Sequence, residues 1–191
     1  IADYTYNYKS DGTTVKTVSY NFYVIGQSKR AEFVNGGEIP TLVLSESYKG
    51  SDATAIDTIN NRRSSTYFAG TEPSDELSDY TLTYKSSSGT VVRSTSINFY
   101  DQDGNTVRAA SAIAALDLLK LTSTYRGNKT TEAGVIMDTL GNTDTGKDIT
   151  NRQSRTYFSS RSAGDEVADY SYNYLSNGST VRSTSYNFYE N

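Results

Sequence analysis

The chain contains no cysteine and no histidine, and these two absences remove most of the side chains that enzymes use for chemistry. Its 191 residues also include no Trp, one Met and two Pro. Without Cys, no disulfide and no thiolate metal site can form. Without His and Cys, the commonest general base and the strongest nucleophile are both missing. We therefore expect a protein that is not an enzyme and that needs no cofactor, with calcium considered below.

Long apolar runs and an excess of one charge are also lacking. No apolar stretch approaches the roughly 20 residues that cross a bilayer, so we expect no membrane span in this segment. Lys and Arg total 18 against 22 Asp and Glu, scattered along a chain of net charge −4, which argues against nucleic acid as a partner. The chain begins at Ile1 with no signal peptide, so we expect a mature segment or an excerpt whose export signal or anchor lies outside it.

Aromatic residues are the abundant feature. The chain has 17 Tyr and 6 Phe, although only 35% of its residues are hydrophobic and its mean hydropathy is −0.60. Aromatic rings bury much area per residue, and the Tyr hydroxyl can stay in water. This composition favours thin, sheet-based packing over a thick conventional core.

An internal repeat organises the chain. Ile1–Tyr8 recurs as Leu77–Tyr84 and as Val167–Tyr174, and the closing segments Tyr20–Tyr23, Ile97–Tyr100 and Tyr186–Tyr189 also match. These anchors define a first unit at residues 1–76, a second at 77–166 and the opening hairpin of a third at 167–191. The second unit carries a 13-residue insertion between Tyr125 and Thr156.

The third copy shows how each hairpin is built. Tyr170, Tyr172 and Tyr174 alternate with small polar residues, which is the period of a strand, and Asn177-Gly178 is typical of a two-residue type I′ turn. With that turn, Tyr172 would face Ser183 and Tyr170 would face Ser185. We therefore expect tyrosine rings to lie over serines on one face, with Thr184, Tyr186 and Phe188 on the other.

These patterns predict an all-β fold with antiparallel sheets in tandem repeat units, either β-sandwiches or stacked hairpins. Ala109–Leu121 has the composition of a helix, but its counterpart Ala31–Leu44 contains Gly36, Gly37 and Pro40. We therefore expect the end of this stretch to be a strand, and a short helix near Ser111–Leu116 stays open.

One segment resembles a known family. Tyr100–Arg108 has the Tyr-Asp-x-x-Gly spacing of YD repeats, the hairpin repeats of RHS-type bacterial proteins. The resemblance covers only the hairpin parts of each unit, and the Gly-Arg-Leu step of the family is absent. It implies a large secreted or surface-displayed bacterial β-repeat protein, and it carries over no catalytic residue.

Two loops have oxygen-bearing side chains at alternate positions, as calcium sites do. They are Asp101, Asp103 and Asn105, and Asn142, Asp144 and Asp148. Neither has the spacing of an EF-hand, and Asp and Asn also belong in turns for conformational reasons. Asn128 and Asn177 fit the N-glycosylation pattern, although the turn role already explains Asn177.

Two further repeated patterns have structural and functional interpretations. The carboxylate pairs Asp75/Glu76 and Asp165/Glu166 could flank a glycosidase cleft, but solvated loop charge is the simpler interpretation. Asn61–Phe68 and Asn151–Phe158 place Arg beside aromatics. Arg stacking on Tyr within the sheet is the structural interpretation, and a platform for sugars or a partner is the functional one.

The function expected from the sequence is structural. We expect a repeat segment or subunit of an extracellular bacterial surface or filamentous assembly, associating with identical chains or neighbouring repeats. It is either a window of a longer array or a subunit that polymerises through its terminal hairpin. The alternative is an adhesive or carbohydrate-binding β module that uses exposed Tyr surfaces to contact glycans. Strand tyrosines that are largely covered by protein would favour the structural hypothesis, whereas coplanar tyrosines exposed in a groove would favour the adhesive one.

Overall fold

The computed structural model describes residues 2–25, 27–30, 40–50, 61–70, 73, 75–109, 118–129, 149, 151–159, 162 and 165–189. The secondary structure found there consists of strands, with no helix long and apolar enough to cross a membrane among these residues. The strands are β1 (Tyr4–Tyr8), β2 (Val15–Ile25), β3 (Gln27–Arg30), β4 (Thr41–Lys49), β5 (Arg62–Ala69), β6 (Leu77–Lys85), β7 (Ser88–Gln102), β8 (Asn105–Arg108), β9 (Leu118–Arg126), β10 (Arg152–Ser159), β11 (Val167–Tyr174) and β12 (Val181–Tyr186).

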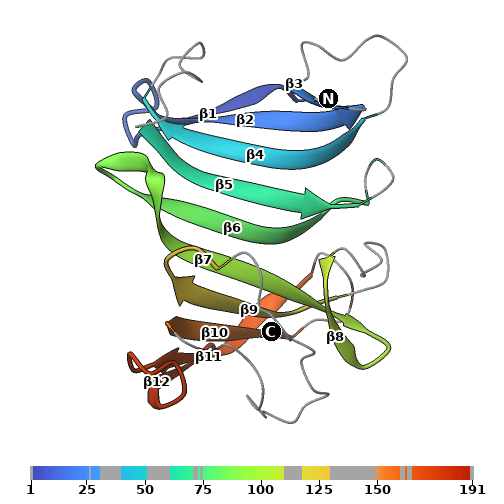
Figure 1. Cartoon of the computed structure of the whole chain (residues 1–191), viewed down its shortest axis with the longest axis vertical. Coiled ribbons are helices and arrows are strands. Elements are labelled where there is room, and N and C mark those ends of the chain that lie inside the picture. The colour runs from blue at the N-terminus through green and yellow to red at the C-terminus, as the bar shows by residue number, and fades with distance from the viewer. Residues whose placement is uncertain are drawn as a thin grey trace. The chain divides into compact units, whose positions relative to one another are not determined.

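The strands pair in sequence order, as successive antiparallel hairpins (Figure 1). The hydrogen-bonded order is β1-β2-β4-β5-β6-β7-β9-β10-β11-β12, with β3 paired to β2 and β8 paired to β7. The all-β antiparallel prediction is therefore confirmed. Compact packing divides the chain into two structural units, the first at Ile1–Arg93 and the second at Ser94–Asn191, so the division falls inside β7. These structural units, called the first and the second unit below, have different bounds from the sequence repeats.

The first and third hairpins have the same structure. Tyr8 pairs with Val15 in β1–β2, and Tyr174 pairs with Val181 in β11–β12, each next to a bulge. Their closing contacts also match, because the hydroxyl of Tyr23 donates to the carbonyl of Ala2 at 2.8 Å and that of Tyr189 donates to Ala168 at 2.7 Å. The sequence repeat is thus a repeat in structure at these hairpins.

The hairpin turn differs from the predicted type I′ turn. Gly178 has φ of 70°, but Asn177 is not among the residues with positive φ, and the Gly178 N–H donates to the carbonyl of Leu175. The Leu175 N–H donates to the carbonyl of Thr180, so four residues form the loop. The side chain of Asn177 stabilises this loop by accepting from the N–H groups of Ser179 and Thr180, at 3.1 and 3.0 Å.

The bulge next to this loop reverses the predicted arrangement of faces. Tyr172 lies opposite Thr184, and Tyr170 lies opposite Tyr186. The prediction that the tyrosines face serines was wrong, because one extra residue in β12 shifts the register by one position and so exchanges the two faces of that strand. The tyrosines of β11 therefore share a face with Tyr186.

Each unit consequently has one aromatic face and one face of short polar side chains. Cross-strand neighbours on the polar face include Thr66 with Thr81, Ser96 with Thr124, and Thr156 with Ser171, each pair with side-chain oxygens 3.0 Å apart. Directly paired positions form a row in each unit. The rows are Thr5, Ser19, Ser47, Ser64 and Thr83 in the first unit, and Ser96, Thr124, Ser154, Asn173 and Ser183 in the second.

The aromatic face carries the core of each unit. In the first unit Val18, Tyr20 and Tyr48 pack together and are buried. In the second unit the buried residues include Ile97, Phe99, Leu121 and Tyr125. Each unit also contains a stacked pair of tyrosine rings. The ring centroids of Tyr67 and Tyr80 lie 4.5 Å apart in the first unit, and those of Tyr157 and Tyr170 lie 4.6 Å apart in the second. Repeated aromatic contacts therefore stabilise each unit separately.

The stretch with helical composition ends in a strand, as predicted, because β9 begins at Leu118. The short helix considered near Ser111–Leu116 lies outside the described residues.

Candidate functional site

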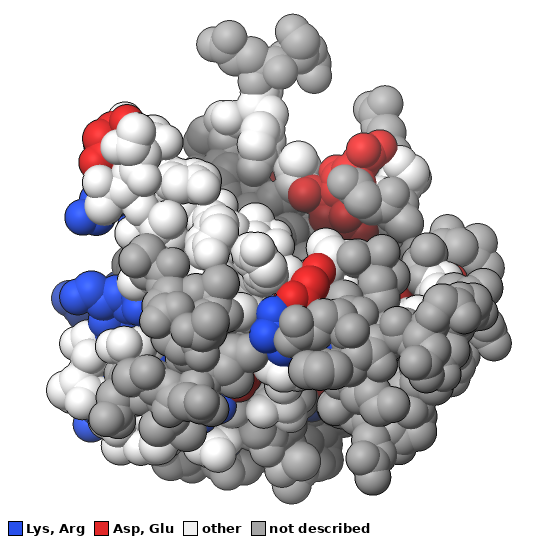
Figure 2. Space-filling view, turned by 90° about the horizontal axis from the view of Figure 1, so that it is seen from above, with Lys and Arg blue, Asp and Glu red and all other residues white. Residues whose placement is uncertain are grey.

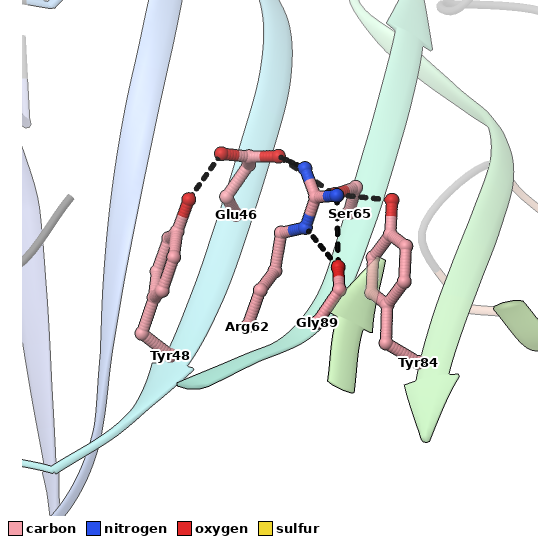
Figure 3. A network of polar contacts seen from close by, with 6 residues as sticks. All are labelled: Glu46, Tyr48, Arg62, Ser65, Tyr84 and Gly89. Atoms are coloured by element: carbon pink, nitrogen blue, oxygen red, sulfur yellow. Dashed lines mark hydrogen bonds and ion pairs between the residues drawn. The ribbon is translucent and has the colours of Figure 1, made fainter. Parts of the chain in front are cut away.

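A buried polar network crosses the aromatic face of the first unit (Figure 3). At its centre, the carboxylate of Glu46 accepts a hydrogen bond from the Tyr48 hydroxyl at 2.6 Å and from the Ser65 hydroxyl at 2.8 Å. The guanidinium of Arg62 lies 2.8 Å from the same carboxylate. All of these side chains come from β4 and β5, so the network joins the two strands.

Strand register brings these residues together. Glu46 lies directly opposite Ser65, and a bulge between Ser47 and Tyr48 places Arg62 opposite Tyr48. The guanidinium of Arg62 then reaches β6 and β7. It stacks 4.1 Å from the centroid of the Tyr84 ring and donates to the carbonyl of Gly89 from Nε and Nη2, at 3.0 and 2.9 Å. The arginine predicted to stack on an aromatic ring does so here.

Burial and the neighbouring charges set the ionisation of the network. Burial raises the pKa of Tyr48 well above its usual range, and the hydrogen bond to Glu46 raises it further. Burial alone would lower the pKa of Arg62, but its hydrogen bond to Glu46 and the nearby Tyr84 raise it overall. Tyr48 therefore stays neutral and Arg62 stays charged, which suits a network that holds strands together.

The second unit has different side chains at some of the equivalent positions. Arg152 corresponds to Arg62, and its guanidinium lies 4.1 Å from the centroid of the Tyr174 ring. The pair Glu46 and Ser65 is replaced by Ser123 and Arg155, which also face each other and join through Nε and Oγ at 3.3 Å. The larger side chain of the facing pair is thus Glu46 on β4 in the first unit and Arg155 on β10 in the second.

This exchange changes the surroundings of the tyrosine that corresponds to Tyr48. The hydroxyl of Tyr125 is buried and has no hydrogen-bond partner within the described part of the chain. In the first unit the acceptor at this place is Glu46, and in the second the position holds Ser123, which is too short to supply one. An unpaired buried hydroxyl costs free energy, so the two networks are not equivalent.

The loop carboxylates have structural partners. Glu76 accepts from the N–H of Leu42 at 2.9 Å, and Glu166 accepts from the N–H of Leu119 at 3.1 Å. Each carboxylate therefore binds the start of the corresponding strand, β4 or β9, at the same place in the repeat. No pattern in the sequence indicates this role, because the two partners are 34 residues apart in the first pair and 47 in the second.

The first predicted calcium loop forms the tight turn between β7 and β8. Asp103 and Gly104 have φ of 52° and 82°, and the carboxylate of Asp101 accepts from the Gly104 N–H at 2.9 Å and lies 3.3 Å from Lys120 Nζ. Asn105 ends this turn. In the described ranges, no three acidic side chains cluster as a metal site would require. Asn142, Asp144 and Asp148 lie outside those ranges, and calcium binding stays a prediction.

The two glycosylation candidates lie in different settings. Asn128 is exposed just after the end of β9. Asn177 is exposed but takes part in its turn, where its amide nitrogen donates to the Thr180 hydroxyl at 2.8 Å.

The strands at the two ends of the pairing order expose large side chains. β1 pairs with β2 and β12 pairs with β11, and these two strands end the hydrogen-bonded order of the described residues. Tyr186 is 63% exposed and Phe188 is 94% exposed, whereas the equivalent residues Tyr20 and Phe99 of the inner copies are fully buried. At the other end, Tyr4 and Tyr8 are 44% and 51% exposed. Each end therefore presents an aromatic edge.

Charged side chains of both signs are visible among uncharged residues on the face of the molecule drawn in Figure 2. Comparisons with protein-family models, with curated proteins and with solved structures found no match.

Proposed function

We propose that this chain is a non-enzymatic structural repeat segment or subunit of an extracellular bacterial surface or filamentous assembly. In this proposal, copies or neighbouring repeats associate through the terminal hairpins, so that the hairpin at the end of one copy continues the sheet of the next. The resemblance to YD repeats belongs to the same proposal, since such hairpin repeats build large secreted or surface proteins.

One observation carries the proposal. The hairpin β11–β12 repeats the register and the closing contacts of β1–β2, yet Tyr20 and Tyr23 of β2 are buried whereas their counterparts, Tyr186 at the end of β12 and Tyr189 just after it, are exposed. At the equivalent edges inside the chain, β4 pairs with β2 and β9 pairs with β7, along eight positions each. An exposed aromatic strand edge is a template for pairing with another chain.

Repetition also explains how so polar a chain gains stability. Each hairpin buries its aromatic face against its neighbours, so an array is more stable than a single copy. The stacked pairs Tyr67–Tyr80 and Tyr157–Tyr170 each join the last strand of one repeat to the first strand of the next.

The test is the state of the 191-residue chain in solution. We expect light scattering coupled to size exclusion to show a mass that grows with concentration, and electron microscopy to show filaments or chains of particles. A mass that stays at 21.0 kDa up to millimolar concentration would contradict self-association.

An adhesive or carbohydrate-binding module is the second candidate, favoured by the exposed tyrosines of β1. The rings of Tyr4 and Tyr6 meet at 65°, and those of Tyr6 and Tyr8 at 57°, so these three do not form a flat platform. Binding on a glycan array that is lost in Tyr4→Ala and Tyr8→Ala, in a chain that stays monomeric, would support this candidate over the structural one.

A further inference from the structure

The backbone of β1 has a defined outward side. The carbonyl of Asp3 accepts from the N–H of Asn21 at 2.9 Å, and the N–H of Lys9 donates to the carbonyl of Thr14 at 2.8 Å. The odd-numbered residues of this strand therefore bond toward β2. Because backbone groups alternate along a strand, those of Tyr4, Tyr6 and Tyr8 point toward the outer edge.

The backbone of β12 has the matching arrangement. The N–H of Asn187 donates to the carbonyl of Asp169 at 2.8 Å, so the odd-numbered positions bond toward β11. The backbone groups of Thr184, Tyr186 and Phe188 then point outward. At both edges, the residues whose backbone is directed outward also carry their side chains on the aromatic face.

The inner repeats show what these edges contact when they are covered. At the edge equivalent to that of β12, Thr95 of β7 faces Tyr125 of β9. At the edge equivalent to that of β1, Tyr80 of β6 faces Tyr67 of β5, with their rings stacked. A threonine–tyrosine pair and an aromatic pair are therefore both established in this fold.

Given the proposed self-association, on which this inference rests, we propose that β12 of one copy, together with the Asn187 and Phe188 that follow it, pairs antiparallel with β1 of a second copy, with Phe188 opposite Tyr4 and Thr184 opposite Tyr8. The first pair repeats the ring contact of Tyr67 with Tyr80, and the second repeats that of Thr95 with Tyr125. Both pairs fit the same register, because four residues separate the two positions on each strand.

This pairing continues the order of the sheet. The strands alternate in direction along it, so an antiparallel β1 after β12 preserves both the alternation and the aromatic face. On the opposite face, Asn7 meets Ser185, and the strand neighbours of these two residues on that face, Thr17 and Ser171, are also short and polar. A slip by one residue would place aromatic side chains among the hydroxyls, so the faces specify the register. Contact of one edge with a different edge joins copies head to tail, which gives a filament when the rotation between copies does not close a ring.

A chain without cysteine allows a direct test by disulfide trapping. Asn7→Cys and Ser185→Cys are made as separate full-length variants and mixed under mild oxidation. The two positions form a non-hydrogen-bonded pair in the proposed register, with Cα atoms about 4.5 Å apart, which a disulfide can span. Ser183→Cys is the matched control, since its diagonal position lies roughly 7–8 Å from Asn7.

The expected result is a cross-linked heterodimer in the mixture of Asn7→Cys with Ser185→Cys, and little cross-linked product in the mixture of Asn7→Cys with Ser183→Cys. If Ser185→Cys instead cross-links mainly to a second Ser185→Cys chain, two β12 edges meet, and the inference is overturned while self-association stands. Oligomers without any cross-link also overturn the proposed pairing alone. A chain that is monomeric at every concentration overturns the pairing and the proposed function together.

Affinity provides a second readout that does not depend on cysteine chemistry. We expect Phe188→Ser to weaken self-association at least about tenfold, because burying an exposed phenylalanine contributes more than the roughly 1.4 kcal/mol that corresponds to tenfold. Val91→Ser, which removes an exposed apolar side chain from β7, is the matched control and should leave association unchanged. Sedimentation velocity measures both, and equal association of the two variants would overturn the pairing.

Discussion

Replacing Glu46 with alanine removes the acceptor that three side chains of the first unit share. The hydroxyls of Tyr48 and Ser65 are buried, and both would lose their bond to the carboxylate, although Ser65 would keep its contact with the Tyr84 hydroxyl at 3.2 Å. Arg62 would lose its ion pair but keep its two bonds to the carbonyl of Gly89. Each buried polar group left without a partner costs about 1–3 kcal/mol.

The expected loss of stability follows from these contacts. We expect Glu46→Ala to lower the free energy of unfolding by about 3–5 kcal/mol, the range found when one partner of a buried ion pair is removed. Glu46→Gln keeps an acceptor without the charge and should cost about 1–2 kcal/mol. Ser45→Ala changes a half-buried neighbour on the polar face, and as the matched control it should cost less than about 0.5 kcal/mol.

Urea unfolding followed by tyrosine fluorescence and near-ultraviolet circular dichroism measures these differences. Hydrogen exchange should place the loss of protection in β4 and β5. A loss below about 1 kcal/mol for Glu46→Ala, or one no larger than that of Ser45→Ala, would refute the view that the network holds these strands together.

The second unit provides a converse test of the same reasoning. Ser123→Glu alone should destabilise, because Arg155 already fills the space that faces Ser123. Adding Arg155→Ser recreates the pair found in the first unit and gives the Tyr125 hydroxyl an acceptor. We expect the double variant to be at least about 1 kcal/mol more stable than Ser123→Glu, as measured by the same unfolding experiment. Equal stability would show that the two networks are not interchangeable.

The remaining predictions concern pH and the hairpin turns. Burial raises the pKa values of Tyr48 and Tyr67 above the ordinary value of about 10, so the folded state disfavours their anions. The stability that these residues contribute is therefore complete below pH 10 and is lost as the pH rises through their higher pKa values in the folded state. A free energy of unfolding that stays constant from pH 9 to pH 12 would contradict this prediction. Gly12 and Gly178 occupy the same turn position with φ of 69° and 70°, but an added Cβ at Gly178 would lie 2.0 Å from the carbonyl oxygen of Ile149, whereas nothing lies within 4 Å at Gly12. Gly12→Ala should cost about 1–2 kcal/mol and Gly178→Ala at least about 1 kcal/mol more in thermal unfolding, and equal costs would be inconsistent with this packing.

Much of the fold follows from local patterns in the sequence. Alternating tyrosines with a glycine turn specify hairpins, and the recurrence of Ile1–Tyr8 as Val167–Tyr174 predicts two hairpins of one structure. The stacking of arginine on tyrosine also follows from a repeated motif, since Arg62 and Arg152 both lie 4.1 Å from a ring. These features depend on neighbours along the chain or on comparison between copies, and the sequence contains both.

Only the tertiary structure decided which side chains share a face and a network. A bulge adds a single residue and leaves the period of the flanking strands intact, so the sequence did not show that Tyr170 faces Tyr186. Nor did it show that Glu46 would meet Arg62, because that contact depends on the register of two strands joined by a long connection. Strand identity is a local property of the polypeptide, whereas the pairing of faces is set by how distant strands align.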